Sequence, residues 1–123
     1  ELIANYHNRI INIHPSLLPQ YPGLNTHQRV LDAAEKIHGT SVHIVNTAID
    51  AGPILSQMQT TVEPFKNAAN LAKHIKTLEH QLYSITLRLI LGEKTHIPST
   101  ITVNDGAIHL LQQALHQHAT TRG

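Results

Sequence analysis

The sequence of 123 residues predicts an α/β fold in which helices flank a small mixed β-sheet. Three observations support this prediction: short β-branched runs bounded by Pro and Gly, one long segment with helical apolar periodicity, and the alternation of the two along the chain. The expected order is strand, helix, strand, strand, helix. Such a sheet is too small to be a complete doubly wound fold.

The first half of the chain predicts a strand, a loop and a short helix. Residues 9–13 are rich in β-branched side chains and predict a buried strand, and residues 16–25 carry the Pro and Gly of a long irregular loop. Thr26 is expected to cap a helix whose apolar stripe reaches Ile37. Gly39 is expected to end that helix.

The middle of the chain predicts two more strands and a long helix. The strands are expected over residues 40–45 and 54–62, with a turn-rich connection between them. Asn67 is expected to cap the helix. Apolar residues recur through it at steps of three and four: Leu71, Ile75, Leu78, Leu82, Ile85 and Leu89.

The last part of the chain predicts a hairpin followed by a tail. Residues 101–110 are typical of a β-hairpin, because Asn104, Asp105 and Gly106 lie between two apolar runs and tolerate the positive φ of a tight turn. Residues 112–123 are expected to form a weak helix or a disordered tail. The sequence therefore divides into a main unit, residues 1–111, and that tail.

Composition limits the classes of protein and site. The absence of Cys excludes disulfides, zinc–thiolate sites and thiol nucleophiles, and it fits the cytoplasm, where we expect the protein. A net charge of +1 without a Lys/Arg stripe argues against a nucleic-acid partner. No apolar run approaches the roughly 20 residues of a membrane span. The 11 His residues are scattered singly, so we expect no metal site.

Asn12 and His14 are the first candidates for chemistry. Side chains two apart on a strand point to the same face, so an amide and an imidazole would lie together where the first strand ends. An amide can donate to a developing oxyanion, and an imidazole can move a proton near neutral pH. Taken alone, the spacing favours the simpler interpretation, in which both side chains satisfy backbone groups at the strand end.

Other polar residues have equally simple interpretations. Asp50 lies in a turn-rich loop, where a turn role needs no further explanation, although a carboxylate near His14 would raise the pKa of the imidazole. Ser41 and His43 share a strand face but lack a nucleophile elbow, so we interpret them as support for the site or as polar residues against a loop. Glu79 and Lys76 suit a surface ion pair.

Together, these pieces resemble the phosphoribosylglycinamide formyltransferases. The resemblance lies in Asn12-Ile13-His14-Pro15-Ser16-Leu17-Leu18-Pro19 with Tyr21-Pro22-Gly23-Leu24, in His38-Gly39-Thr40-Ser41-Val42-His43, and in Ile49-Asp50-Ala51-Gly52-Pro53. It implies the C-terminal part of a Rossmann-like formyltransferase fold, which is incomplete without its N-terminal half. No Gly-rich phosphate loop is found in the sequence, and Glu1 opens directly into helix-like sequence, so we expect the chain to begin partway through a longer product.

The resemblance implies roles for particular residues. His14 would be the acid–base group, Asn12 would polarise the formyl oxygen and also contact the folate, and Asp50 would sustain the protonated state of His14. The folate would be held by Asn46, Thr47, Ala48, Ile49 and Asp50. The ribonucleotide substrate would be approached by Lys76, Thr77, Leu78 and Glu79.

The implied activity is transfer of the formyl group of 10-formyltetrahydrofolate to the amine of 5'-phosphoribosylglycinamide in purine biosynthesis, with no metal. The expected partners are small-molecule substrates and, in an assembly, a second copy of the chain; no nucleic acid or membrane is expected. Two departures bear on loop geometry: Ala51 stands where relatives usually have Gly, and Asn25 where His is common. The alternatives are a related folate-dependent formyltransferase, a formyl-folate hydrolase, or a piece that is inactive alone.

Overall fold

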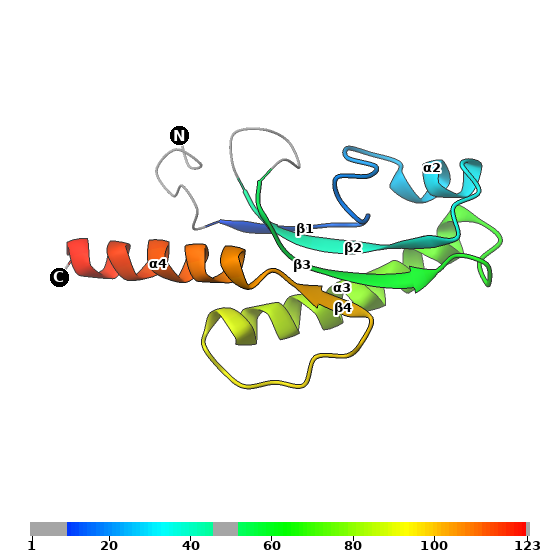
Figure 1. Ribbon diagram of the computed structural model, residues 1–123. Coiled ribbons are helices and arrows are strands. Elements are labelled where there is room, and N and C mark those ends of the chain that lie inside the picture. Colours follow the sequence, from blue (N-terminus) through cyan, green and yellow to red (C-terminus); the bar gives the residue numbers. More distant parts are fainter. Residues whose placement is uncertain (1–9, 46–51, 123) are drawn as a thin grey trace.

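The structure is a computed structural model that describes residues 10–45 and 52–122, with side chains through His116. A four-stranded sheet has the strand order β1-β2-β3-β4, and the long helix α3 packs along one of its faces, mainly against β2 and β3 (Figure 1). The short helix α2 contacts α3 at one end of the molecule, and α4 extends from the other end. None of the described helices has the length and apolar character needed to cross a bilayer.

The four strands are β1 (Ile11–His14), β2 (Ile37–Ile44), β3 (Ile54–Thr61) and β4 (Ile101–Val103). Each neighbouring pair is antiparallel. The sheet and its flanking helices confirm the α/β class. The parallel pairing that a mixed sheet requires does not occur among the described strands. The register places Asn12 opposite His43, His14 opposite Ser41, and Ser41 opposite Gln57, which brings the candidate residues together on adjacent strands.

Strand β1 forms one edge of the described sheet. The Val45 N–H donates to the Ile10 carbonyl at 2.7 Å, and hydrogen-bonded pairs alternate along an antiparallel ladder. Asn12 and His14 consequently direct their backbone groups toward β2, while those of Ile11 and Ile13 point to the outer edge. The side chains of Ile11 and Ile13 pack partly buried against the core.

Helix α3 (Ala68–Ile90) forms as predicted. The Asn67 side chain caps it by accepting the Asn70 N–H at 2.8 Å, and its core-facing residues are Leu71, Ile75, Leu78, Leu82, Thr86 and Ile90. Thr86 also makes a buried hydroxyl–hydroxyl bond of 2.6 Å to Ser56 on β3. Apolar packing, supplemented by this polar bond, fixes the helix on the sheet.

The predicted extent of the first helix was wrong. Helix α2 (Thr26–Asp32) follows Asn25, which has a left-handed backbone and makes no side-chain cap, so Thr26 is inside the helix and does not cap it. The helix ends early because Ala34 also adopts a left-handed backbone, with φ 54°. Ile37 and Gly39 belong to β2, where pairing with β3 outweighs the local helical pattern.

The predicted hairpin over residues 101–110 was also wrong. Only its first strand, β4, forms, and residues from Asp105 onward make the helix α4 (Asp105–Arg122). The Asn104 side chain caps this helix by accepting the Ala107 N–H at 3.1 Å. Ala107, Ile108 and Leu111 then bury one face. The proposed boundary between residues 111 and 112 therefore falls within a continuous helix.

Candidate active site

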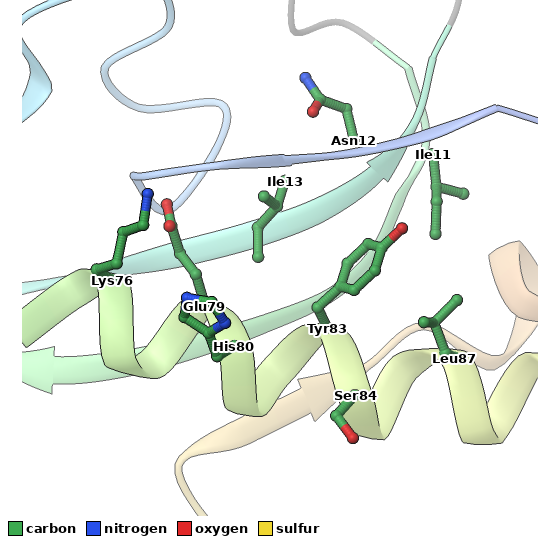
Figure 2. Close-up of a pocket in the computed structure, with 9 residues that line it drawn as sticks. All are labelled: Ile11, Asn12, Ile13, Lys76, Glu79, His80, Tyr83, Ser84 and Leu87. Atoms are coloured by element: carbon green, nitrogen blue, oxygen red, sulfur yellow. The ribbon is translucent and has the colours of Figure 1, made fainter.

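Asn12 and His14 lie on β1 with opposite degrees of exposure. Asn12 is exposed, whereas His14 is only 6% exposed. Figure 2 shows Asn12 pointing away from α3 while Ile11 and Ile13 point toward it, as strand alternation requires. The predicted pairing of an amide and an imidazole on one strand face is therefore consistent with the regular geometry of β1.

The imidazole of His14 is held by the loop that follows it. Its Nε2 lies 2.8 Å from the Tyr21 carbonyl oxygen. The backbone carbonyl of His14 accepts from the Ser16 N–H and from the Thr40 hydroxyl, both at 2.9 Å. Both the ring and the backbone of His14 are therefore fixed by short polar contacts, as an acid–base group requires.

Ser41 and His43 are buried on β2, with exposed fractions of 0% and 3%. The Ser41 hydroxyl donates to the Ser16 carbonyl at 2.7 Å and accepts the Leu18 N–H at 3.0 Å. Ser41 thus lies against the loop, as one of the two predicted interpretations requires. The Nδ1 atom of His43 lies 3.4 Å from the Ile44 carbonyl oxygen.

Two further histidines near His14 were not predicted to have a role. His27 Nδ1 and His38 Nε2 are 3.1 Å apart, and the rings meet edge to face. Burial, followed by the charges of His27 and His14, lowers the pKa of His38 to about 4. Burial, then the charge of His14, also lowers the pKa of His27. His27 lies in α2 and His38 on β2, so their contact gave no local signal in the sequence.

The His38 pKa predicts acid sensitivity. Because the folded value, about 4, lies below the ordinary 6.5, the unfolded chain binds the extra proton between these pH values. The free energy of unfolding is therefore expected to be fully retained above pH 6.5 and to fall toward pH 4, by about 3 kcal/mol from this group. Urea unfolding from pH 7.5 to pH 4 measures the slope, and His38→Gln should make it shallower. An identical slope in the two proteins would contradict the assignment.

A cavity of about 510 Å³ lies between β1 and α3. Its walls include Asn12 from the strand and Lys76, Glu79 and Tyr83 from the helix, and Figure 2 shows the Lys76 and Glu79 side chains directed toward β1. The structure therefore places the strand segment that carries Asn12 beside two of the four predicted substrate-binding residues, Lys76 and Glu79, although the Asn12 side chain points away from α3.

Glu79 is the half-buried acid of this cavity. Burial raises its pKa, and the positive charges of Lys76, His80 and His14 act in the opposite direction. His14, although not in the cavity wall, is thus close enough to influence the charge on Glu79.

The remaining predicted site residues do not line this cavity or lie outside the described residues. Leu78 packs in the hydrophobic core, and the Thr77 hydroxyl donates to the His74 carbonyl at 2.6 Å, so neither side chain lines the cavity. Apart from Asn12, the predicted folate-binding residues lie outside the described residues: Asn46, Thr47, Ala48, Ile49 and Asp50. Convergence of Asp50 on His14 stays a prediction. In the described part of the chain, no cluster of three or more His, Asp or Glu side chains could hold a metal ion.

No role was predicted from the sequence for Gln57 on β3. Its amide donates to the Leu18 carbonyl at 2.8 Å, on the same loop that holds His14, and to the Ser41 hydroxyl on β2 at 2.9 Å. A polar residue in the centre of a predicted strand is the signal that could have indicated a specific contact.

Comparison with known proteins places the chain in a family. Residues 1–87 match the formyl transferase family, and the chain belongs to it. It is 39% identical to the phosphoribosylglycinamide formyltransferase of Escherichia coli over 85 residues, which cover 69% of this chain and 40% of that protein. The crystal structure of phosphoribosylglycinamide formyltransferase from Anaplasma phagocytophilum superposes with a TM-score of 0.71 at 36% identity, covering 83% of this chain and 51% of that one.

A related enzyme has a similar fold at lower identity. The formyltetrahydrofolate deformylase of Pseudomonas syringae matches with a TM-score of 0.70 at 26% identity, covering 83% of this chain and 35% of the deformylase. In each of these comparisons the chain spans about half, or less, of the length of the relative.

Proposed function

We propose that this chain supplies the acid–base strand and the substrate-facing helix of a phosphoribosylglycinamide formyltransferase, an enzyme of purine biosynthesis that we expect in the cytoplasm. The main supporting observation is the cavity between β1 and α3, in which Lys76 and Glu79 face the strand that carries Asn12 and His14, and the imidazole of His14 is held by the Tyr21 carbonyl. Family membership and the activity of the similar Escherichia coli enzyme support this reaction over other acyl transfers.

The proposed reaction is direct formyl transfer without a covalent enzyme intermediate. The neutral glycinamide amine attacks the formyl carbon carried on N10 of 10-formyltetrahydrofolate, and the C–N10 bond then breaks. Asn12 and His14 donate to the oxyanion that forms in between, and donors fixed in advance avoid solvent rearrangement. One such donor contributes roughly 3–4 kcal/mol to lowering the barrier. Asp50 holds the water that carries the amine proton to N10.

The proposed substrate orientation follows from the two walls of the cavity. Glu79 accepts from the ribose hydroxyls of phosphoribosylglycinamide, with Lys76 beside it, because both side chains point toward β1 from α3 (Figure 2). Residues 46–50, which lie outside the described residues, are assigned to the pterin ring of the folate in this proposal. The proposed reaction uses no metal.

The choice of formyl acceptor tests the proposed function. The complete product of the gene that contains this chain, and the 123 residues alone, are assayed with 10-formyltetrahydrofolate and either phosphoribosylglycinamide or water as the acceptor. We expect the complete product to form formylglycinamide ribonucleotide, with release of free formate at least about a hundredfold slower. Formate release at a rate independent of phosphoribosylglycinamide would instead identify a hydrolase, as the deformylase similarity allows.

A further inference from the structure

The contact between His14 and Tyr21 determines where the imidazole carries its proton. Nε2 of His14 lies 2.8 Å from the Tyr21 carbonyl oxygen, and a carbonyl oxygen can only accept a hydrogen bond. Nε2 is therefore protonated in the neutral as well as in the charged ring. The proton that is gained and lost is the one on Nδ1, so acid–base chemistry of this ring takes place at Nδ1.

The position of the Tyr21 carbonyl is set by the loop around it. The Ser16 hydroxyl contacts the carbonyls of Gln20 at 2.6 Å and Tyr21 at 3.2 Å, and Ser16 is fully buried. Tyr21 has a left-handed backbone, with φ 53°, which a residue with a side chain adopts only when its surroundings impose it. Arg29 contributes on the outside, donating to the Pro22 carbonyl at 2.7 Å.

A second set of bonds ties this loop to the centre of the sheet. Gln57 Nε2 donates to the Leu18 carbonyl at 2.8 Å and to the Ser41 hydroxyl at 2.9 Å. The Ser41 hydroxyl also accepts the Leu18 N–H at 3.0 Å and donates to the Ser16 carbonyl at 2.7 Å. Both backbone groups of Leu18 are thus held by two side chains from β2 and β3.

The Ser41 hydroxyl and the amide nitrogen of Gln57 use all of their hydrogen-bonding capacity within this network. A Ser hydroxyl has one hydrogen to donate and two lone pairs, and all three are engaged at Ser41. Both amide hydrogens of Gln57 are engaged as well. Removal of either side chain would leave buried polar groups of the loop unpaired, which favours a rearranged loop over a vacant contact.

We propose that Ser41 and Gln57 are positioning residues for His14: through Leu18 and Ser16 they hold the Tyr21 carbonyl that keeps the imidazole protonated on Nε2. They do not touch the reacting atoms. The consequence for catalysis rests on the proposed function, whereas the consequence for the imidazole proton does not.

The tautomer of His14 is directly measurable. Nitrogen-15 NMR of the complete gene product, recorded with the ring neutral, distinguishes a proton on Nε2 from one on Nδ1. We expect the wild-type His14 to be protonated on Nε2, and a wild-type ring protonated on Nδ1 would overturn the proposal without any variant.

The variant Gln57→Leu removes both amide donors at nearly constant size. We expect a mixture of His14 tautomers and a kcat for formyl transfer lowered about ten- to a hundredfold, with KM for phosphoribosylglycinamide changed less than about twofold. Gln59→Leu is the matched control, because Gln59 is an exposed side chain on the same strand. It should keep the wild-type tautomer and kcat.

Ser41→Ala is the second variant, should Gln57→Leu fail to fold. A folded variant that keeps the wild-type tautomer, or that shifts it without loss of kcat, overturns the proposal. If the wild-type protein transfers no formyl group but the tautomer still shifts in the variants, the positioning of His14 is supported, and the proposed function is what fails.

Discussion

His14→Ala in the complete gene product is expected to lower kcat for formyl transfer by about 10²–10⁴-fold, the usual contribution of a positioned acid–base group. The substitution removes the ring that the Tyr21 carbonyl orients beside the cavity, while the Asn12 amide remains. Steady-state kinetics with 10-formyltetrahydrofolate and phosphoribosylglycinamide measure the effect. The KM for the ribonucleotide should change little, because the proposed substrate contacts lie on α3.

The control for this variant is a distant histidine. His96 is exposed in the segment between α3 and β4, so His96→Ala should leave kcat within about twofold of the wild type. Thermal unfolding of both variants separates lost chemistry from lost structure. Turnover near the wild-type rate in folded His14→Ala would remove His14 from the proposed mechanism.

Gly39→Ala is expected to have the largest effect on folding. A Cβ at position 39 would lie 2.0 Å from the Met58 carbonyl oxygen and 2.8 Å from Leu17 Cδ2. The oxygen belongs to the backbone of β3, so relief requires β2 and β3 to separate at the centre of the sheet. We expect the free energy of unfolding to fall by about 3 kcal/mol or more, measured by urea denaturation.

Gly106→Ala is the matched control for Gly39→Ala. The nearest atom to an added Cβ there is Asn104 Oδ1 at 3.4 Å, and the residue lies in the first turn of α4, where Ala is the better helix former. Its free energy of unfolding should stay the same or rise. Equal stability of Gly39→Ala and the wild type would show that the two strands are not packed as closely as described.

The elements that the sequence predicted well are those with strong local signals. Asn67 and the periodic apolar residues of α3 specify a helix, its start and its buried face as far as Leu82, whereas Thr86 and Ile90 are buried in the last turns in place of the expected Ile85 and Leu89. The hairpin prediction failed because Asn104, Asp105 and Gly106 suit a turn as well as a helix start. Burial of Ala107, Ile108 and Leu111 favours the helix over the hairpin, and this burial depends on tertiary packing.

The candidate site shows the same difference between local signals, which the sequence reveals, and contacts between distant segments, which it does not. The shared face of Asn12 and His14 follows from strand alternation alone, whereas the substrate-binding roles proposed for Lys76 and Glu79 rest on a family resemblance. The contacts of His38 and Gln57 were not predicted, because each depends on a segment that is distant in sequence: His27 in one case, Leu18 and Ser41 in the other.

Helix α3 has two sides that cannot be adjusted independently. Its buried side is fixed against the sheet by close packing and by the Ser56–Thr86 bond, and the neighbouring side carries Lys76 and Glu79 into the cavity. The width of that cavity therefore depends on the volumes of core side chains that do not line it. A methylene group gained or lost at Leu82 would shift the helix and, with it, the distance between Glu79 and β1.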